Sequence, residues 1–293
     1  MNCDAVILLD KQVEITSQTA ITQIKRKFKL KKIGHCGTLD PKASGLLICL
    51  TGKLTKLAQY IEGEDKIYSG SILLGKRTTT DDLEGEVIFS SDSIPDIQSC
   101  QDIIQKKFIG LIDQVPPQYS AIKVEGKRAY QIARSGESSD LKSRQVKIKK
   151  FEIYTKTDNE ISFLIECTKG TYIRSLARDI GQELGCGACL SSLRREVSVP
   201  FNVLEAKKID ALSEGDFLGW ISLFPDHYKL LISEHDCRRL KDGNKQTLQN
   251  LNDKFSKDFR NLRYVVYYEE TTNKPLGLLI NNATNLEFGF CIL

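Results

Sequence analysis

The part of the chain best equipped for chemistry is a glycine-rich segment, residues 32–47, that carries an imidazole, a thiol and a carboxylate. These groups belong to His35, Cys36 and Asp40. Glycines allow backbone shapes and close approaches that side chains would block. Pro41 restricts the residue before it to an extended backbone, which gives the Asp40 carboxylate a reproducible direction. Composition alone favours a simpler interpretation, a tight surface turn in which Asp40 caps a neighbouring N–H.

This segment resembles the signature of the TruB family of pseudouridine synthases, a run of glycine, histidine, any residue, glycine, threonine, leucine, aspartate and proline. Later segments resemble further motifs of that family, in the same order along the chain. They are Lys66-Ile67-Tyr68, residues 75–85, residues 116–130, residues 169–176 and Leu193-Arg194-Arg195. The likeness is dense over about residues 5–200 and weak beyond them.

The resemblance implies a set of site residues. The implied catalytic residues are Asp40, Tyr68 and Arg174. The implied substrate-binding residues are His35, Lys56, Asp82, Tyr172 and Leu193. In this family pattern the aspartate acts at the sugar, the arginine keeps it ionised and the first tyrosine stacks on an extruded base. The histidine then occupies the space that the base has left, and the leucine forms an apolar wall.

The activity that the resemblance implies is conversion of uridine to pseudouridine at position 55, in the T loop of tRNA. That reaction breaks the C1′–N1 bond, turns the uracil and joins C1′ to C5. No redox change or group donor is involved, so we expect no cofactor and no metal ion. A nucleotide inside folded RNA must be extruded before an enzyme can reach it. A fixed carboxylate can stabilise or trap the charge that develops at C1′.

The sequence departs from the family pattern at two places. The run Lys11-Gln12-Val13-Glu14 lacks the proline and the glycine that usually follow the first strand. Thr79 stands where an acidic residue is common. Neither change touches Asp40 or Arg174, so we expect altered peripheral RNA contacts with the catalytic groups retained.

Composition is that of a folded, water-soluble chain. Hydrophobic residues make up 41% and charged residues 27% of the 293 residues, which excludes collagen-like and disordered classes. No apolar run is long enough to span a bilayer, and the N-terminal apolar stretch lacks the flanks of a signal peptide. The nine cysteines are odd in number and lack disulfide spacing. We therefore expect a reduced, cytoplasmic protein whose cysteines, Cys186 and Cys189 included, are packing residues.

Charge distribution says more about partners than the net charge of +4 does. Basic residues crowd segments 25–32 and 142–150, and two arginine pairs follow at Arg194-Arg195 and Arg238-Arg239. Such clusters suit an RNA phosphate backbone, although any one of them is more simply a solvated face. With the family resemblance, they predict the T arm of tRNA as the partner. We expect a monomer with no obligate protein partner.

Hydrophobic patterns predict an α+β fold. The family resemblance implies the pseudouridine synthase fold, with a mixed, largely antiparallel central sheet flanked by helices. The patterns place a small β-rich domain at 227–293 after a large domain at 1–226. The resemblance implies that the small domain is a PUA-like RNA-binding domain and the large one the pseudouridine synthase catalytic domain. The predicted strands are 5–9, 46–50, 67–76, 119–126, 144–155, 160–168, 263–269, 276–280 and 287–292. The predicted helices are one that Ser17 caps, 53–61, 99–110, 127–135, 173–185 and one short helix in the tail. Residues 33–45 are predicted to form a loop.

Two other function classes fit parts of the sequence. A tRNA-binding folding chaperone without required catalysis would keep the basic segments, but retention of Asp40, Tyr68 and Arg174 argues against it. An RNA methyltransferase with Cys36 as nucleophile would need a methyl-donor site. No glycine-rich donor motif follows a clear strand, which disfavours this class.

Overall fold

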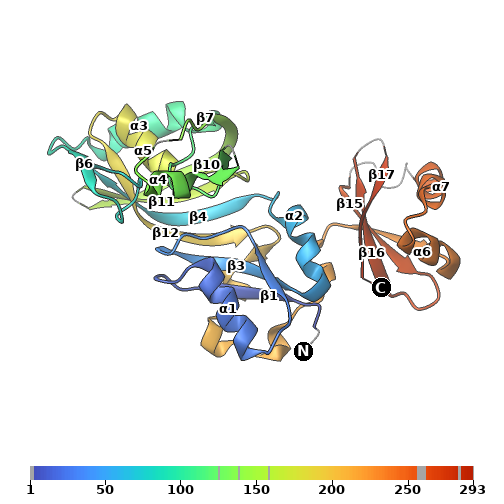
Figure 1. Cartoon of the computed structure of the whole chain (residues 1–293). Coiled ribbons are helices and arrows are strands. Elements are labelled where there is room, and N and C mark those ends of the chain that lie inside the picture. Colours follow the sequence, from blue (N-terminus) through green and yellow to red (C-terminus); the bar gives the residue numbers. More distant parts are fainter. Residues whose placement is uncertain are drawn as a thin grey trace.

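The computed structural model describes residues 3–124, 126–137, 139–157, 159–255, 262–282 and 285–292. Within these ranges the chain forms a large body around a nine-stranded sheet and a small C-terminal body around a four-stranded sheet. The two bodies lie side by side, with α2 of the large body facing the small one (Figure 1). No helix in the described ranges combines the length and the apolarity needed to cross a membrane.

The elements of the large body follow one another from the N-terminus to residue 223. Its strands are β1 (Val6–Lys11), β2 (Ile33–Cys36), β3 (Ala43–Thr51), β4 (Lys66–Leu74), β5 (Lys76–Thr78), β6 (Val87–Ser90), β7 (Gly110–Gln114), β8 (Lys123–Val124), β9 (Lys127–Arg128), β10 (Arg144–Thr157), β11 (Glu160–Cys167), β12 (Ala188–Ser198) and β13 (Phe201–Asn202). Its α-helices are α1 (Ser17–Lys27), α2 (Ala58–Ile61), α3 (Ile97–Lys107), α4 (Ala129–Arg134) and α5 (Ile173–Glu183). Its 3₁₀ helices are η1 (Gly52–Leu57), η2 (Val203–Glu205), η3 (Ile209–Ala211), η4 (Glu214–Asp216) and η5 (Trp220–Leu223).

The main sheet has the strand order β1-β3-β12-β4-β11-β10-β7, with β2 added on β3 and β13 on β12. Its strand pairs are antiparallel except β12 with β3, which run parallel. The α+β class with a mixed, largely antiparallel sheet is therefore confirmed. Strand β12 lies at the centre of the sheet and joins the half that holds β1 to β3 with the half that holds β4, β10 and β11.

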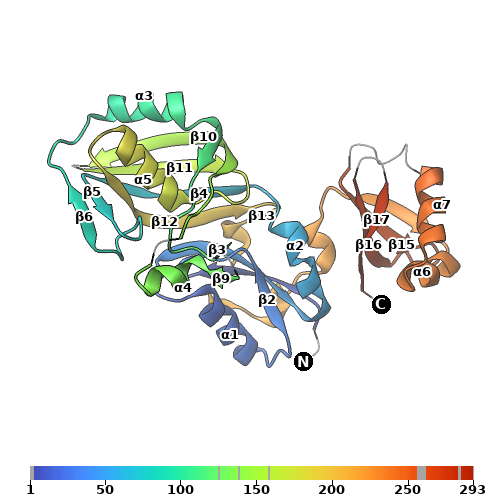
Figure 2. The ribbon, with the colours of Figure 1, turned by 45° about the horizontal axis from the view of Figure 1, so that its top comes forward.

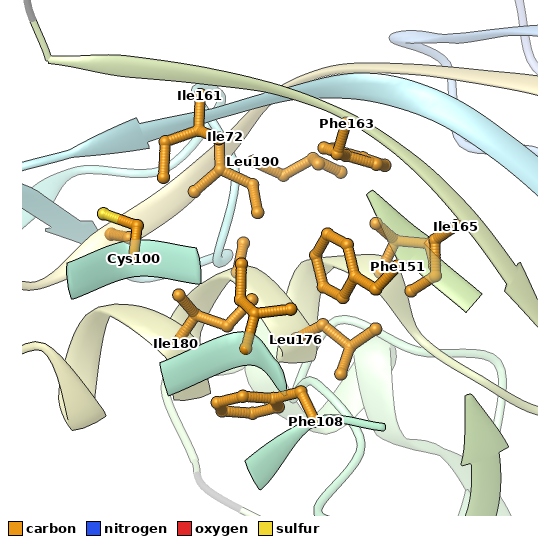
Figure 3. Close-up of a cluster of buried hydrophobic side chains, with 14 of the residues drawn as sticks. Ile72, Cys100, Phe108, Phe151, Ile161, Phe163, Ile165, Leu176, Ile180 and Leu190 are labelled. Atoms are coloured by element: carbon orange, nitrogen blue, oxygen red, sulfur yellow. The ribbon is translucent and has the colours of Figure 1, made fainter. Parts of the chain in front are cut away.

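Helices α3 and α5 cover one face of the second half of the sheet (Figures 1 and 2). In α5 the buried apolar residues recur every three or four positions, at Ile173, Leu176 and Ile180, which gives the helix one apolar side. In β11 alternate residues from Ile161 to Ile165 are buried, so every second side chain faces the helices. These two patterns meet in the hydrophobic cluster of Figure 3. This packing fixes the start of α5.

Helix α1 packs against β1 and β3 through Ala20, Ile21 and Ile24, each at most 4% exposed. The prediction that Ser17 caps this helix is wrong. The N-cap is Thr16, whose backbone is extended and whose hydroxyl accepts the Thr19 N–H at 2.9 Å. Ser17 is the first helical residue and is buried.

The C-terminal body consists of β14 (Tyr228–Ile232), α6 (Glu234–Lys241), α7 (Lys245–Phe255), β15 (Tyr264–Glu269), β16 (Pro275–Asn281) and β17 (Leu286–Cys291). One apolar cluster joins it to the large body, because Val266, Leu278 and Phe290 pack with Trp220 and Phe224. Polar contacts reinforce this junction.

The polar contacts of the junction come from both sides of α2, because Lys53 lies before it on η1 and Glu64 follows it. Glu64 binds the Arg263 guanidinium at 2.8 Å and the Tyr264 hydroxyl at 2.9 Å. Lys53 donates to the carbonyl oxygen of Ile292 at 2.9 Å. The C-terminal body is thereby fixed beside the segment that leads into β4.

Three predicted elements need correction, and one central strand was not predicted. Residues 33–45 are not all loop, because 33–36 pair with β3 as strand β2, and this pairing outweighs the turn-forming residues. Of the described residues in the predicted strand 119–126, two, Lys123 and Val124, pair with β9, so the strand is shorter than predicted. The tail has two helices instead of one. Strand β12, which no local pattern predicted, exists because it is paired on both sides.

Candidate active site

The carboxylate of Asp40 and the guanidinium of Arg174 form an ion pair, with 3.0 Å between Oδ2 and Nε. Asp40 lies in the loop between β2 and β3, and Arg174 lies in the first turn of α5. The arginine side chain is 8% exposed, whereas the aspartate side chain keeps 41% of its surface. The Asp40 carboxylate is therefore accessible from solvent, while the guanidinium that it contacts is buried.

The other nitrogens of Arg174 are held by fixed acceptors. Nη2 donates to the carbonyl oxygen of Tyr119 at 2.9 Å, and Nη1 donates to that of Thr80 at 3.2 Å. A second carboxylate, Asp82, lies 3.5 Å from Nη1. The planar guanidinium offers donors in a rigid fork, so these contacts fix its orientation toward Asp40.

Burial raises the pKa of the Asp40 carboxyl above its ordinary value, and the negative charge of Asp82 adds to this effect. The cations Arg174 and Lys11 act in the opposite direction, and the net direction is upward. Arg174 thus offsets part of the desolvation of the carboxylate without cancelling it. A carboxylate so placed is more basic than an exposed aspartate.

The raised pKa of Asp40 predicts where the rate falls on the acid side of the pH–rate profile. If ionised Asp40 is required, kcat falls on acidification at a pH above the ordinary aspartate pKa of 3.8. Replacing Asp82 by Asn removes a charge that raises the Asp40 pKa, so the acid limb should move to lower pH. Single-turnover rates at saturating RNA, measured from acid to neutral pH, check this. An acid limb that stays in place or moves upward in D82N would contradict the proposed coupling.

A cavity of about 410 Å³ opens beside the ion pair. Of the predicted site residues, those on its wall are Asp40, Tyr68, Tyr172, Arg174 and Leu193. They come from separate places in the sequence: the loop before β3, strand β4, the start of α5 and strand β12. Tyr68 is 9% exposed, and burial raises the pKa of its hydroxyl. The wall therefore combines an ion pair with aromatic and aliphatic surfaces.

A second cavity, of about 350 Å³, shares Asp40, Arg174 and Leu193 with the first. The predicted residue Asp82 lies on this second wall, together with Leu83. Asp82 is 9% exposed, and its Oδ1 accepts the backbone N–H of residue 84 at 3.0 Å. Asp82 therefore lies next to the ion pair, but on the wall of the second cavity.

His35 and Lys56 line neither of these two cavities. His35 lies on β2, where burial lowers the pKa of its imidazole. Its Nδ1 has no hydrogen-bond partner among the described residues. Lys56 is exposed on η1. The structure thus gives neither residue a contact with the Asp40–Arg174 pair.

Arg195 is a site residue that sequence reasoning missed. The sequence predicts that it binds phosphate together with Arg194, but it is 1% exposed and lies on the wall of the larger cavity. Its Nε donates to the carbonyl oxygen of Leu46 at 2.7 Å, and its Nη2 donates to that of Gly37 at 3.2 Å. Neighbouring residues of a strand face opposite sides, so only one arginine of the pair reaches solvent. Recognition of β12 as a strand would have revealed this.

The backbone of Arg195 also explains Gly45. A Cβ at this glycine would lie 2.3 Å from the carbonyl oxygen of Arg195, and the glycine φ is +100°. Any other residue would push β12 away from β3, and the cavity wall would move with it.

Lys11 remains close to the site although its loop departs from the family pattern. Its side chain is fully buried, and its Nζ donates to the carbonyl oxygens of Gln12 and Ile15, both at 2.8 Å, and of Pro41 at 3.4 Å. Burial lowers the pKa of this lysine to about 8. The ammonium therefore ties the altered loop to the residue that follows Asp40.

The cysteine in the loop is poorly suited to nucleophilic attack. Cys36 is 1% exposed, and burial raises the pKa of its thiol to about 12. The reactive form of a cysteine is the thiolate, which this environment disfavours. Cys186 and Cys189 are also buried, and all nine cysteines are free thiols. Within the described ranges no group of histidine, cysteine, aspartate and glutamate residues has the arrangement of a metal site.

Comparison with known proteins identifies the family of the chain. Residues 25–173 match the model of the TruB family pseudouridylate synthase N-terminal domain. The chain is 41% identical over 218 residues to tRNA pseudouridine synthase B of Francisella tularensis subsp. holarctica, covering 74% of this chain and 72% of that protein. It is 40% identical over 257 residues to tRNA pseudouridine synthase B of Agrobacterium fabrum, covering 81% and 80%.

Among solved structures, the fold resembles a chain in the crystal structure of a Cbf5-Nop10-Gar1 complex, with a TM-score of 0.71. That match covers 99% of this chain and 85% of the other at 21% identity, so it concerns the fold alone. The fold, the family model and the identity to curated relatives lead to one assignment. The chain belongs to the TruB family of pseudouridylate synthases.

Proposed function

We propose that this protein converts uridine to pseudouridine at position 55, in the T loop of tRNA, with Asp40 as the catalytic carboxylate. The observation that carries the proposal is the 3.0 Å pair of Asp40 and Arg174 on the wall of a cavity that also holds Tyr68. Membership of the family and its relatives' names, tRNA pseudouridine synthase B, support the choice of reaction and of tRNA.

Asp40 acts at the sugar of the extruded nucleotide. Cleavage of the C1′–N1 bond builds positive charge at C1′, and a carboxylate next to it stabilises or traps that charge. Arg174 orients the carboxylate and offsets its desolvation. Attack at C1′, attack at C6 of the uracil and elimination through a glycal can all begin from this arrangement. On each route the C1′–N1 bond is replaced by a C1′–C5 bond, and the proton lost from C5 is balanced by one gained at N1. The product is therefore an isomer of the substrate, and no cofactor is consumed.

The remaining wall residues hold the uracil. Tyr68 stacks on the extruded base, Tyr172 packs beneath the site and Leu193 closes an apolar side. Asp82 steadies Arg174 from the second cavity. His35 fills the space that the base leaves in the RNA, and Lys56 orders the substrate RNA. Neither side chain lines the two cavities, so both act on parts of the RNA outside them.

The RNA contacts come from the basic segments and from the C-terminal residues. Residues 25–32 lead into the Asp40 loop, and Arg144 of segment 142–150 lies 6.0 Å from the ring centroid of Tyr172 at the cavity. Residues 227–293 serve as the PUA-like RNA-binding domain, and 1–226 as the catalytic domain. The protein acts in the cytoplasm as a monomer.

The decisive assay uses wild-type protein and an unmodified T-arm minihelix, with pseudouridine located by a carbodiimide stop in primer extension. A stop at the position of the target uridine supports the proposal. Tight binding with no stop would support a tRNA-binding chaperone instead. Stops at other uridines would contradict the assigned specificity.

Salt dependence tests the RNA-binding segments. If four to six phosphates are contacted, affinity for the minihelix should fall about 10²–10³-fold between about 50 and 200 mM salt. Lys31 and Lys32 are exposed directly before β2. The double variant K31A/K32A should lower the slope of log K against log salt by about 1–2, with kcat unchanged. A flat response in wild type, measured by filter binding, would count against phosphate contacts.

A further inference from the structure

The peptide groups of Leu39, the residue before Asp40, are held by one side chain. The Ser17 hydroxyl accepts the Leu39 N–H at 2.8 Å and donates to the Leu39 carbonyl oxygen at 3.0 Å. Ser17 is 2% exposed and Leu39 is 3% exposed. A buried hydroxyl that donates and accepts at the same residue fixes both ends of that residue's backbone.

The hydroxyl belongs to a rigid support. Ser17 is the first residue of α1, which is anchored by Ala20, Ile21 and Ile24 in the core. The cap of that helix is supplied by Thr16, so the Ser17 hydroxyl is not needed for capping and is free to face the loop. The two neighbouring hydroxyls therefore have different roles: that of Thr16 caps the N-terminus of α1, and that of Ser17 binds the loop.

The loop has other attachments on either side of this point. The Gly37 carbonyl accepts from Arg195, and the Pro41 carbonyl accepts from the Glu14 N–H at 2.9 Å. Between these attachments, the hydrogen bonds to the N–H and C=O of Leu39 found within the described ranges both come from Ser17. Ser17 thus supplies the attachment nearest to Asp40 on its N-terminal side.

We infer that Ser17 is a positioning residue that sets the direction of the Asp40 carboxylate by clamping the peptide groups of Leu39. The inference rests on the proposed function, because it assigns Ser17 a part in the same reaction. Removing the hydroxyl leaves a buried N–H and a buried C=O without partners, which is unfavourable. The backbone then shifts to find new partners, and Asp40 moves with it.

The test compares Ser17→Ala, Ser17→Cys and Thr16→Ala in the full-length protein. Cysteine keeps the approximate shape but hydrogen-bonds weakly, so S17C separates loss of the clamp from loss of volume. We expect kcat for S17A and S17C to fall about 10–100-fold, the effect of a small misplacement, with KM for the minihelix nearly unchanged. We expect T16A to lose thermal stability, by about 2–4 °C in Tm, with kcat close to wild type.

A second readout is specific to the clamp. Because desolvation raises the Asp40 pKa, a loosened loop that lets more water reach the carboxylate should move the acid limb of the S17A pH–rate profile to lower pH. The T16A profile should stay in place. Wild-type kcat in S17A and S17C, or an equal loss of kcat in T16A at a similar Tm, would overturn the inference. Failure of the proposed function would look different, because wild type itself would form no product.

Discussion

Asp40→Asn should abolish pseudouridine formation while the protein stays folded. Asparagine has nearly the same shape but carries no charge, so it can neither stabilise nor trap positive charge at the sugar. Loss of a nucleophile or of an essential charge typically lowers kcat by at least about 10⁴-fold. Single-turnover assays on the minihelix, with the product mapped by carbodiimide stops, measure this loss. Circular dichroism and minihelix affinity should stay close to wild type.

The matched control for this variant is Cys36→Ala, a change in the same loop. The thiol of Cys36 is buried and its pKa is raised to about 12, so it has no part in the proposed chemistry. Its removal should leave kcat within about two- to threefold of wild type, as expected for a side chain that makes no contact in the transition state. Activity in D40N with inactivity in C36A would overturn the assignment of the carboxylate.

Arg174→Lys should lower kcat by about 10²–10³-fold and also destabilise the fold, by about 1–3 kcal/mol. Lysine keeps the charge, but its single ammonium cannot reach Asp40, the Tyr119 carbonyl and the Thr80 carbonyl from one fixed position. The carboxylate should lose its orientation, and buried carbonyl groups should lose their donors. Urea unfolding and single-turnover kinetics measure the two effects separately.

Arg178→Lys separates catalysis from stability. Arg178 lies one turn further along α5 and pairs with Asp81 at 3.1 Å and Asp179 at 2.8 Å. It also donates to the Val115 carbonyl oxygen at 2.8 Å, so its loss removes a comparable set of contacts. R178K should therefore be destabilised like R174K but keep most of its kcat. Equal loss of kcat in both variants would mean that Arg174 acts through stability alone.

The junction with the C-terminal body shows how far the site depends on the whole chain. Glu64 binds Arg263 and Tyr264 of that body, and two residues later Lys66 lies on the wall of the larger cavity. Lys66 itself donates to the Glu64 carbonyl oxygen at 2.6 Å. One short segment, residues 64–66, thus both contacts the C-terminal body and forms part of the cavity wall.

The sequence by itself determined the family and the residues with reactive groups. The ordered series of family motifs was specific enough to imply Asp40, Tyr68 and Arg174, and the structure places all three on the wall of one cavity. Helix α5 was predictable because its apolar residues follow a helical period. These features depend on residue type and spacing, which are local properties of the chain.

Tertiary structure alone decided which charged groups are buried and which strands exist. Local patterns gave no sign of β12, because its formation depends on partners on both sides. That strand buries Arg195 and leaves Arg194 partly exposed beside Asp10, a difference that a basic pair in the sequence cannot show. The clamp between Ser17 and Leu39 joins positions far apart in the sequence. Burial and long-range hydrogen bonds are properties of the packed chain, and they set the pKa and the direction of Asp40.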